Sequence, residues 1–290
     1  MSDIDNGIVY LNGEFLPAGE AKISVLDRGF IFGDGVYEVI PVYGGHLFRL
    51  PHHLQRLDHS LEGIHMANPL AHNHWQAVLE QLVELNGGGD QSLYLQVTRG
   101  VAKRDHGFPP DTEPTVFAMS NPISAVPESL REGIAAATVE DFRWKLCHIK
   151  AIALLPNILL RQQAVEAGAE EAIMLRDGFV TEGAASNVFI VNNGVVLTPP
   201  KSNLLLPGVT RDLVVELCQQ NGLPCVEGAI SEMQLKEADE IWLTSSSREI
   251  IPVTRLDGLP VGDGRPGRGW QQLIALYQQY KQAFREGRVT

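Results

Sequence analysis

The sequence has few cysteines, and none of them is paired at the spacing of a redox or metal motif. Its 290 residues contain only Cys147, Cys218 and Cys225, an odd number with no C-x-x-C pair. The start, Met1-Ser2-Asp3-Ile4-Asp5, lacks the basic and apolar regions of a signal peptide. We therefore expect free thiols and a location in the reducing cytoplasm.

Long apolar runs and an excess of basic residues are also absent. No stretch reaches the roughly 18 apolar residues that a membrane span needs, and 23 Lys and Arg face 35 Asp and Glu, for a formal net charge of −12. Nucleic-acid binding depends on clustered Lys and Arg. The sequence thus predicts neither a membrane nor a nucleic-acid partner, and any anionic ligand must be held by a few local cations.

The length favours two domains. In the first third, the turns Asn12-Gly13 and Gly44-Gly45 lie between apolar segments and predict antiparallel hairpins. Strands are expected at residues 8–11, 14–16, 36–43, 46–50, 93–98 and 115–119, and helices at residues 54–64 and 74–85. This pattern predicts a small N-terminal α/β domain at residues 1–121, followed by a proline-containing linker at residues 122–132.

Residues 133–290 are expected to form the larger, C-terminal domain. Turns at Asp177-Gly178 and Asn193-Gly194 predict two further hairpins, and Ser231 with Gln234 predicts a capping box. Other expected elements are strands at residues 134–139 and 240–244, helices at 158–167 and after Pro207-Gly208, and a final helix with Leu273, Tyr277, Tyr280 and Phe284 on one face.

Two motifs point to chemistry that we do not expect. The run from Gly262 to Gly267 matches G-x-G-x-x-G, but it lacks a second strand and an acid at the ribose distance, so it predicts a turn. Histidines crowd one interval without a clean i,i+4 pair or a cysteine partner, which favours a solvated helical face over a metal site. They are His52, His53, His59, His65, His72 and His74. No metal is expected.

A lysine and a glutamate carry the strongest chemical signal. Lys150 ends the segment Cys147-His148-Ile149-Lys150, and Glu182 lies in Phe179-Val180-Thr181-Glu182 about thirty residues later, in the register expected of paired strands. A pyridoxal phosphate (PLP) enzyme needs an amine for a Schiff base and a carboxylate that keeps the pyridine nitrogen protonated. Taken singly, each residue is better explained as a snorkelling lysine or a surface glutamate, so the case depends on the residues around them.

Three segments could hold the phosphate of such a cofactor. Pro207-Gly208-Val209-Thr210 puts a glycine turn at a helix start, where free N–H groups favour anions. Arg56 offers a forked guanidinium, although a surface ion pair would also explain it. The segment Thr244-Ser245-Ser246-Ser247 follows a strand with four hydroxyls, which would suit any polar loop as well.

Taken together, these residues and the run from Asp27-Arg28-Gly29-Phe30 to Tyr37-Glu38-Val39 resemble fold-type-IV PLP enzymes, and within them bacterial D-amino-acid aminotransferases. The similarity extends nearly from end to end. It implies an α/β (α+β) fold with two domains, the larger with a β-barrel-like core. It also implies Lys150 as the catalytic residue that binds the cofactor and moves protons. The cofactor-binding set that it implies is Arg56, Lys150, Glu182, Ser186, Asn187, Leu206, Val209, Thr210, Ser245 and Ser246.

One further segment bears on the substrate. Arg104 and His106 are two residues apart, so in an extended segment they project to the same side and could grip a carboxylate. By the resemblance, they reach across a homodimer interface and join Tyr37 around the substrate α-carboxylate. The alternative is that this segment is a charged loop tip without a binding role. The implied reaction moves the amino group of a D-amino acid to 2-oxoglutarate, giving D-glutamate and a 2-oxo acid.

Relatives of the same fold remain alternatives. Branched-chain aminotransferases typically have Gly-Gly-Asn-Tyr after the lysine and Glu-Asn before the next apolar pair, whereas this chain has Ala151-Ile152-Ala153-Leu154 and Ser186-Asn187. Aminodeoxychorismate lyases and R-selective amine transaminases are not expected to keep Tyr37, Arg104 and His106 together. A non-catalytic PLP-fold binding protein is the alternative from another class, and the presence of both Lys150 and Glu182 argues against it.

Overall fold

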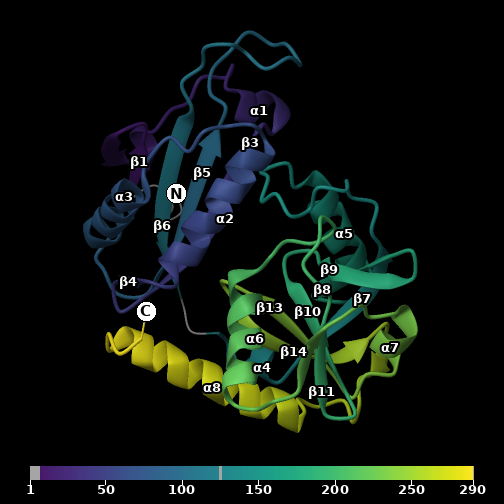
Figure 1. The fold of residues 1–290 in the computed structure, drawn as a ribbon. Coiled ribbons are helices and arrows are strands. Elements are labelled where there is room, and N and C mark those ends of the chain that lie inside the picture. Colours follow the sequence, from purple (N-terminus) through teal and green to yellow (C-terminus); the bar gives the residue numbers. More distant parts are fainter. Residues whose placement is uncertain (1–6, 124–125, 290) are drawn as a thin grey trace. The chain divides into compact units, whose positions relative to one another are not determined.

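The computed structural model describes residues 7–123 and 126–289, which divide into two compact units (Figure 1). Unit 1 contains the described residues up to 123, together with Ile149–Ala153 and the end of the chain from Phe284. Unit 2 contains the remainder. The domain limits expected at residues 1–121 and 133–290 stay a prediction, and the expected linker includes positions 124 and 125, outside the described residues. The chain start, Met1 to Asp5, also lies outside them.

Unit 1 is built on a six-stranded sheet in the order β2-β1-β6-β5-β3-β4, in which all neighbours pair antiparallel. Local turn chemistry explains its hairpins, since Asn12 and Gly13 both have positive φ. The strands are β1 (Ile8–Leu11), β2 (Glu14–Pro17), β3 (Gly35–Tyr43), β4 (His46–Leu47), β5 (Gln91–Thr98) and β6 (Thr115–Pro122). The helical segments are η2 (Ala18–Glu20), α1 (Arg28–Phe32), α2 (Leu50–Gly63) and α3 (His72–Leu85).

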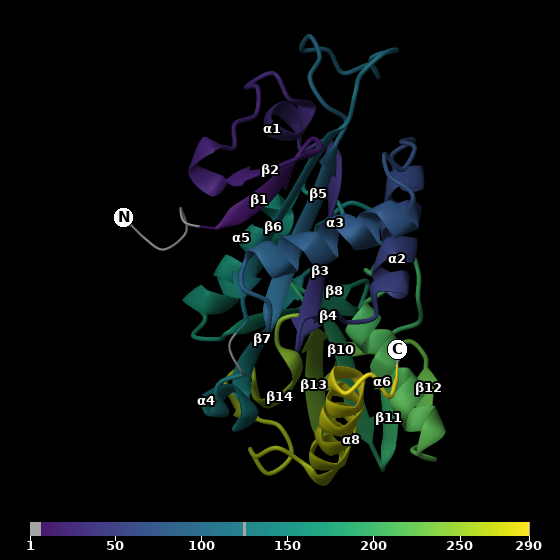
Figure 2. The same cartoon turned by 90° about the vertical axis from the view of Figure 1, so that its left-hand side faces the viewer.

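The core of unit 1 lies between this sheet and the helices α2 and α3, which run beside it in both views (Figures 1 and 2). Ile40 faces Leu93 across β3 and β5, and both are fully buried against the helices. Because strand side chains alternate between faces, Glu38 lies on this helix side of the sheet and Tyr37 on the other side. Glu38 and Tyr37 therefore have different surroundings, although they are neighbours in the sequence.

Unit 2 contains a mixed nine-stranded sheet in the order β12-β11-β10-β13-β14-β7-β8-β9, with β15 paired to β14. At the end of this order, β9 comes back against β10, so the sheet curls. The strands are β7 (Ile134–Glu140), β8 (Glu171–Arg176), β9 (Phe179–Gly183), β10 (Asn187–Asn192), β11 (Val195–Thr198), β12 (Cys225–Glu227), β13 (Glu240–Ser245), β14 (Glu249–Leu256) and β15 (Leu259–Pro260). The helices are α4 (Glu128–Arg131), α5 (Leu155–Glu166), α6 (Val209–Gln220), α7 (Glu232–Lys236) and α8 (Arg268–Arg285).

Most expected elements are present, and the differences have local causes. The capping box at Ser231 is formed, and the final helix buries Leu273 and Tyr277. The strand expected at residues 46–50 stops at Leu47, because α2 begins at Leu50 with a proline in its first turn. The mixed α/β content and the curled sheet of unit 2 confirm the predicted fold class.

Five of the six clustered histidines are exposed, as expected of a solvated face. His53 is the exception: it is 1% exposed and its Nδ1 lies 2.8 Å from a Glu38 carboxylate oxygen. The described residues contain no group of three or more His, Cys, Asp or Glu side chains placed to hold a metal ion.

Candidate active site

Lys150 lies on a loop of unit 1, with its amine beside an aromatic ring. Its carbonyl oxygen accepts a hydrogen bond from the N–H of Tyr37 at 2.9 Å, and its N–H donates to Ser60 Oγ at 3.1 Å. Nζ lies 4.2 Å from the centroid of the Tyr37 ring. Among the described side chains, no carboxylate forms an ion pair with this amine. The amine therefore lies beside the Tyr37 ring without an ion pair to a carboxylate of the described residues.

The expectation of paired strands around Lys150 is wrong in its first half. Glu182 does lie in a strand, β9, but Cys147 to Lys150 forms turns and loop. The backbone after Lys150 is bound instead to the start of β3, where the N–H of Ile152 donates to the carbonyl of Gly35 at 3.1 Å.

Tyr37 belongs to a small aromatic surface on its face of the sheet. It pairs with Gln96 in the β3–β5 register, and its ring stacks on Tyr94 at a centroid distance of 5.6 Å. The Tyr94 hydroxyl donates to Gln96 Oε1 at 2.7 Å. Burial, and then the neighbouring Tyr37, raise the pKa of Tyr94 to about 12. Tyr94 is therefore neutral near pH 7, and the Tyr37 ring on which it stacks lies beside the Lys150 amine.

Arg104 and His106 are exposed on the loop between β5 and β6. Both lie against the ring of Phe32: the guanidinium carbon of Arg104 is 5.5 Å from its centroid, and the His106 ring is 5.5 Å away. Arg28 fixes the loop by donating to the carbonyl of Asp105 at 2.7 Å. The loop therefore presents the two side chains together, as their spacing predicts.

Arg56 is buried rather than at the surface. Its Nε and Nη2 donate to the two carboxylate oxygens of Glu38, each at 2.7 Å, which is a bidentate ion pair. Burial raises the pKa of Glu38, but the charge and hydrogen bonds of Arg56, with those of His53, outweigh it and bring that pKa to about 2. Burial lowers the pKa of His53. The predicted role of Arg56 toward a phosphate stays a prediction.

Glu182 lies buried at the end of β9 in unit 2, with both carboxylate oxygens engaged. Oε1 accepts from Arg143 Nη1 at 2.6 Å, and Oε2 accepts from the N–H of Leu206 at 3.0 Å and from Asn187 Nδ2 at 3.4 Å. Asn187 Nδ2 also donates to the carbonyl of Leu206 at 2.8 Å. Three of the predicted residues therefore meet here in one hydrogen-bonded cluster.

Arg143 and Asp141 were not expected from the sequence. The Asp141 carboxylate binds Arg143 in a bidentate pair, with both distances 2.9 Å, and is itself buried. An Asp-x-Arg after a strand is a common surface pattern, and the contact with Glu182 crosses 39 residues of sequence. The only sequence signal for this pair is its position, with an acid and an arginine two residues apart shortly before Lys150.

The start of α6 continues the same cluster. Gly208 caps the helix without a side-chain hydrogen bond, so the first-turn N–H groups of Val209 and Thr210 have no acceptor within the helix. A Cβ atom at Gly208 would lie 2.0 Å from Asn187 Oδ1, which excludes any larger residue unless Asn187 moves. A helix N-terminus of this kind favours an anion.

Hydroxyl groups lie near this cluster, and two of them are unpaired. Ser186 Oγ and Thr244 Oγ1 are buried without a hydrogen-bond partner among the described residues. Thr244 pairs directly with Asn187 in the β10–β13 register. Ser245 Oγ accepts instead from the N–H of Arg248 at 3.2 Å, closing the turn that contains Ser246. Thr244 is thus the residue of this segment whose unpaired hydroxyl lies on the strand position next to Asn187.

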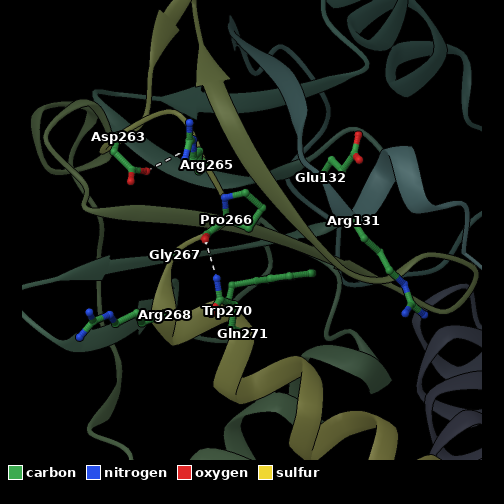
Figure 3. A pocket seen from close by; sticks show the side chains of 9 residues that line it. All are labelled: Arg131, Glu132, Asp263, Arg265, Pro266, Gly267, Arg268, Trp270 and Gln271. Carbon is green, nitrogen blue, oxygen red and sulfur yellow. Dashed lines mark hydrogen bonds between the residues drawn. The ribbon is translucent and has the colours of Figure 1, made fainter.

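A separate hollow of about 670 Å³ in unit 2 contains none of the predicted residues (Figure 3). It lies at the start of α8, where the turn from Gly262 to Gly267 meets the helix, and this segment is a turn as predicted. Arg265 and Arg268 are exposed, and Asp263 and Glu132 add the opposite charge to its lining. The hollow does not resemble a buried cofactor site.

Comparison with known proteins defines the class. The family model described as amino-transferase class IV matches residues 35–256. D-alanine aminotransferase of Bacillus licheniformis is 42% identical over 259 residues, covering 89% of this chain and 92% of that protein. The same-named protein of Staphylococcus haemolyticus is 39% identical over 273 residues, covering 94% and 97%.

Solved structures agree on the fold. The branched-chain amino acid aminotransferase of Escherichia coli matches with a TM-score of 0.88 at 26% identity, covering 99% of this chain and 96% of that one. The branched-chain aminotransferase of the thermophilic archaeon Thermoproteus uzoniensis, solved with norvaline, matches with a TM-score of 0.86 at 27% identity, covering 97% and 95%. The chain belongs to the class IV aminotransferases. It is a PLP-dependent aminotransferase of fold type IV, as the resemblance implied.

Each unit, taken by itself, contains groups that this cofactor requires. PLP carries an aldehyde, a ring nitrogen and a phosphate, which require an amine, a carboxylate and an anion site. Unit 1 provides the Lys150 amine. Unit 2 provides the Glu182 carboxylate, the uncapped start of α6 and the unpaired hydroxyls of Ser186 and Thr244.

Proposed function

We propose that the chain is a D-amino-acid transaminase that moves the amino group of a D-amino acid, such as D-alanine, to 2-oxoglutarate. The products are D-glutamate and the matching 2-oxo acid. The observation that carries this proposal is the 38–42% identity to D-alanine aminotransferases over 89–95% of the chain. The occurrence of Tyr37, Arg104 and His106 in one chain supports it further.

Lys150 holds the cofactor and moves the substrate proton. When bound, PLP supplies an aldehyde that takes up the amino group and a ring that withdraws electrons from the α-carbon. The Lys150 amine would hold the cofactor by its aldehyde, and its Nζ would take the substrate α-proton and return it. The Tyr37 ring, 4.2 Å away, limits where Nζ can move and keeps water from that side.

Glu182 keeps the cofactor's ring nitrogen protonated. Arg143, bound to one carboxylate oxygen, favours the ionised form of Glu182, and an ionised carboxylate favours a proton on a facing nitrogen. Leu206 and Asn187 hold the other oxygen in one orientation. Val209 and Thr210 at the start of α6 bind the phosphate, together with Arg56, Ser186 and the segment from Thr244 to Ser246.

The substrate α-carboxylate is bound by Tyr37, Arg104 and His106. The structure supports the pairing of Arg104 with His106, since both side chains lie against Phe32. Their exposure in the single chain fits a role in a second subunit, as the resemblance implies, and the enzyme is then a homodimer in which this loop completes the partner's site. Holding the carboxylate and the amino group together fixes which α-hydrogen faces Lys150.

A branched-chain L-amino-acid aminotransferase is the second candidate, because the solved structures named above are of that kind. Sequence positions close to Lys150 and Glu182 distinguish the two candidate functions. Ala151, Ile152 and Ser186 depart from the branched-chain pattern, and the Arg104-x-His106 pair is typical of the D-specific group. These features favour D-amino acids.

The experiment that tests the proposal is a paired assay of the purified enzyme with 2-oxoglutarate and the two enantiomers of alanine, aspartate and leucine. We expect D-glutamate from D-alanine and little product from any L-amino acid. Faster turnover of L-leucine than of D-alanine would identify the second candidate. A colourless protein that does not respond to added PLP would identify a binding protein instead.

The location is proposed from the same reasoning. All three cysteines are free, which fits a reducing cytoplasm. No helix in the described part of the chain is long and apolar enough to cross a membrane. The net charge of −12 continues to argue against a nucleic-acid partner. The partners are small amino acids and 2-oxo acids.

A further inference from the structure

Behind Glu182 lies a buried row of alternating charges, of which the proposed mechanism uses only Arg143. Arg143 donates from Nη1 to Glu182 at 2.6 Å and from Nε and Nη2 to Asp141 at 2.9 Å. Arg176 lies on the far side, with Nη2 3.1 Å from Asp141 Oδ1. The order of charges is therefore minus, plus, minus, plus, starting from Glu182.

Hydrogen bonds from β8 and β9 hold this row of side chains in place. The N–H of Asp141 donates to the carbonyl of Leu175 in β8 at 2.7 Å, and Thr181 Oγ1 in β9 donates to Asp141 Oδ2 at 2.9 Å. Arg176 Nη2 also donates to the carbonyl of Arg143 at 2.8 Å. The side chains of Asp141, Arg143 and Glu182 are 0%, 5% and 7% exposed. Little solvent is present to screen their charges.

The charges have opposite effects on a cation in front of Glu182. Arg143 alone would offset the charge of Glu182 and repel a protonated ring nitrogen. Asp141 restores the negative balance from behind. Burial lowers the pKa of Arg143, but its hydrogen bond to Asp141 and the charges of Glu182 and Asp141 outweigh it and raise that pKa. Burial raises the pKa of Asp141, but the hydrogen bonds and the charge of Arg143 outweigh burial and lower this pKa. Both side chains are thus charged near neutral pH.

We propose that Asp141 is a positioning residue that acts through Arg143: it leaves Glu182 with enough negative charge to favour a proton on the ring nitrogen of the cofactor. This inference rests on the proposed role of Glu182. It assigns Arg143 to holding Glu182 in place and Asp141 to preventing Arg143 from neutralising it.

The test compares two cofactors that differ only at the ring nitrogen. Apoenzyme is titrated with PLP and with its carbocyclic analogue, in which a C–H group replaces that nitrogen, and the ratio of the two dissociation constants is measured. Wild type should bind PLP more tightly than the analogue. Asp141→Asn, which keeps the shape and removes the charge, should reduce this preference by about tenfold. Asp141→Glu should keep most of it.

A second variant predicts the opposite sign and covers the case in which Asp141→Asn does not fold. Arg176→Gln removes a positive charge from the far side of Asp141 and should increase the preference for PLP. The control Arg255→Gln removes the same charge at an exposed position and should leave the preference unaltered. If Asp141→Asn and Arg176→Gln weaken both cofactors equally and leave the ratio at the wild-type value, their role is structural and the inference is wrong.

The same titration separates this inference from the function on which it rests. A wild-type enzyme without any preference for PLP would refute the role of Glu182, and with it this inference. A wild-type enzyme that transaminates D-alanine and prefers PLP, but whose preference survives both charge changes, refutes the role of Asp141 alone.

Discussion

The ion pair between Glu38 and Arg56 predicts a specific dependence of stability on pH. Glu38 is fully buried, and its carboxylate accepts two hydrogen bonds from Arg56 at 2.7 Å and contacts His53 at 2.8 Å. Removing one partner of a buried pair typically costs about 3–5 kcal/mol, because the other charge is left uncompensated. Glu38→Gln should lower the free energy of unfolding at pH 7 by about this amount.

The sign of the pH effect follows from the lowered pKa. The pKa of Glu38 falls from 4.5 to about 2 in the folded protein, and at about 1.4 kcal/mol per pKa unit this corresponds to roughly 3 kcal/mol of stability. The contribution is fully present above the unfolded value of 4.5 and is lost as the pH falls toward 2. Between pH 7 and pH 3.5, about 1 kcal/mol of it should disappear.

Urea unfolding of wild type and Glu38→Gln at pH 7 and pH 3.5, followed by tryptophan fluorescence, measures this contribution. Other carboxylates titrate in both proteins and cancel in the difference between them. The stability gap between the two proteins should be smaller at pH 3.5 by about 1 kcal/mol. An equal gap at both pH values would show that Glu38 is not held ionised by Arg56.

Three further substitutions test the site itself. Lys150→Ala should abolish both turnover and the visible absorbance of bound cofactor, while the exposed control Lys145→Ala keeps them; normal transamination by the first variant would refute its assignment. Arg104→Ala should raise KM for amino acids roughly tenfold or more and leave KM for amines without a carboxylate nearly unchanged, and equal increases would count against a carboxylate contact. Gly208→Ala should weaken PLP binding at least several-fold, because the new Cβ would lie 2.0 Å from Asn187 Oδ1. The control Gly19→Ala, with open space around it, should bind PLP as wild type does, and unchanged binding by both variants would show that the start of α6 does not hold the cofactor.

Local chemistry explains the parts of the fold that could be predicted. The first residues of three predicted hairpin turns, Asn12, Asp177 and Asn193, all have positive φ, and the glycine after each does too. A turn of this type needs only its own two residues, so the sequence signal is sufficient. The start of α6 at Pro207-Gly208 and the capping box at Ser231 are local in the same sense.

The parts that could not be predicted depend on contacts between distant residues. Lys150 is in a loop because its backbone is bound to Tyr37, and no periodicity in the sequence encodes that contact. Arg56 and His53 have the composition of a helix surface, yet Glu38 draws both into the interior. Arg143 reaches Glu182 across 39 residues. In the last two cases a charged group is buried because its partner is buried with it, which only the tertiary structure reveals.

The most direct test is a crystal structure of the enzyme with PLP bound. We expect a covalent bond between Lys150 Nζ and the aldehyde carbon of the cofactor, with a carboxylate oxygen of Glu182 about 2.7–3.0 Å from the ring nitrogen of the same molecule. A cofactor attached to another lysine, or a ring nitrogen that faces a group other than Glu182, would contradict the account.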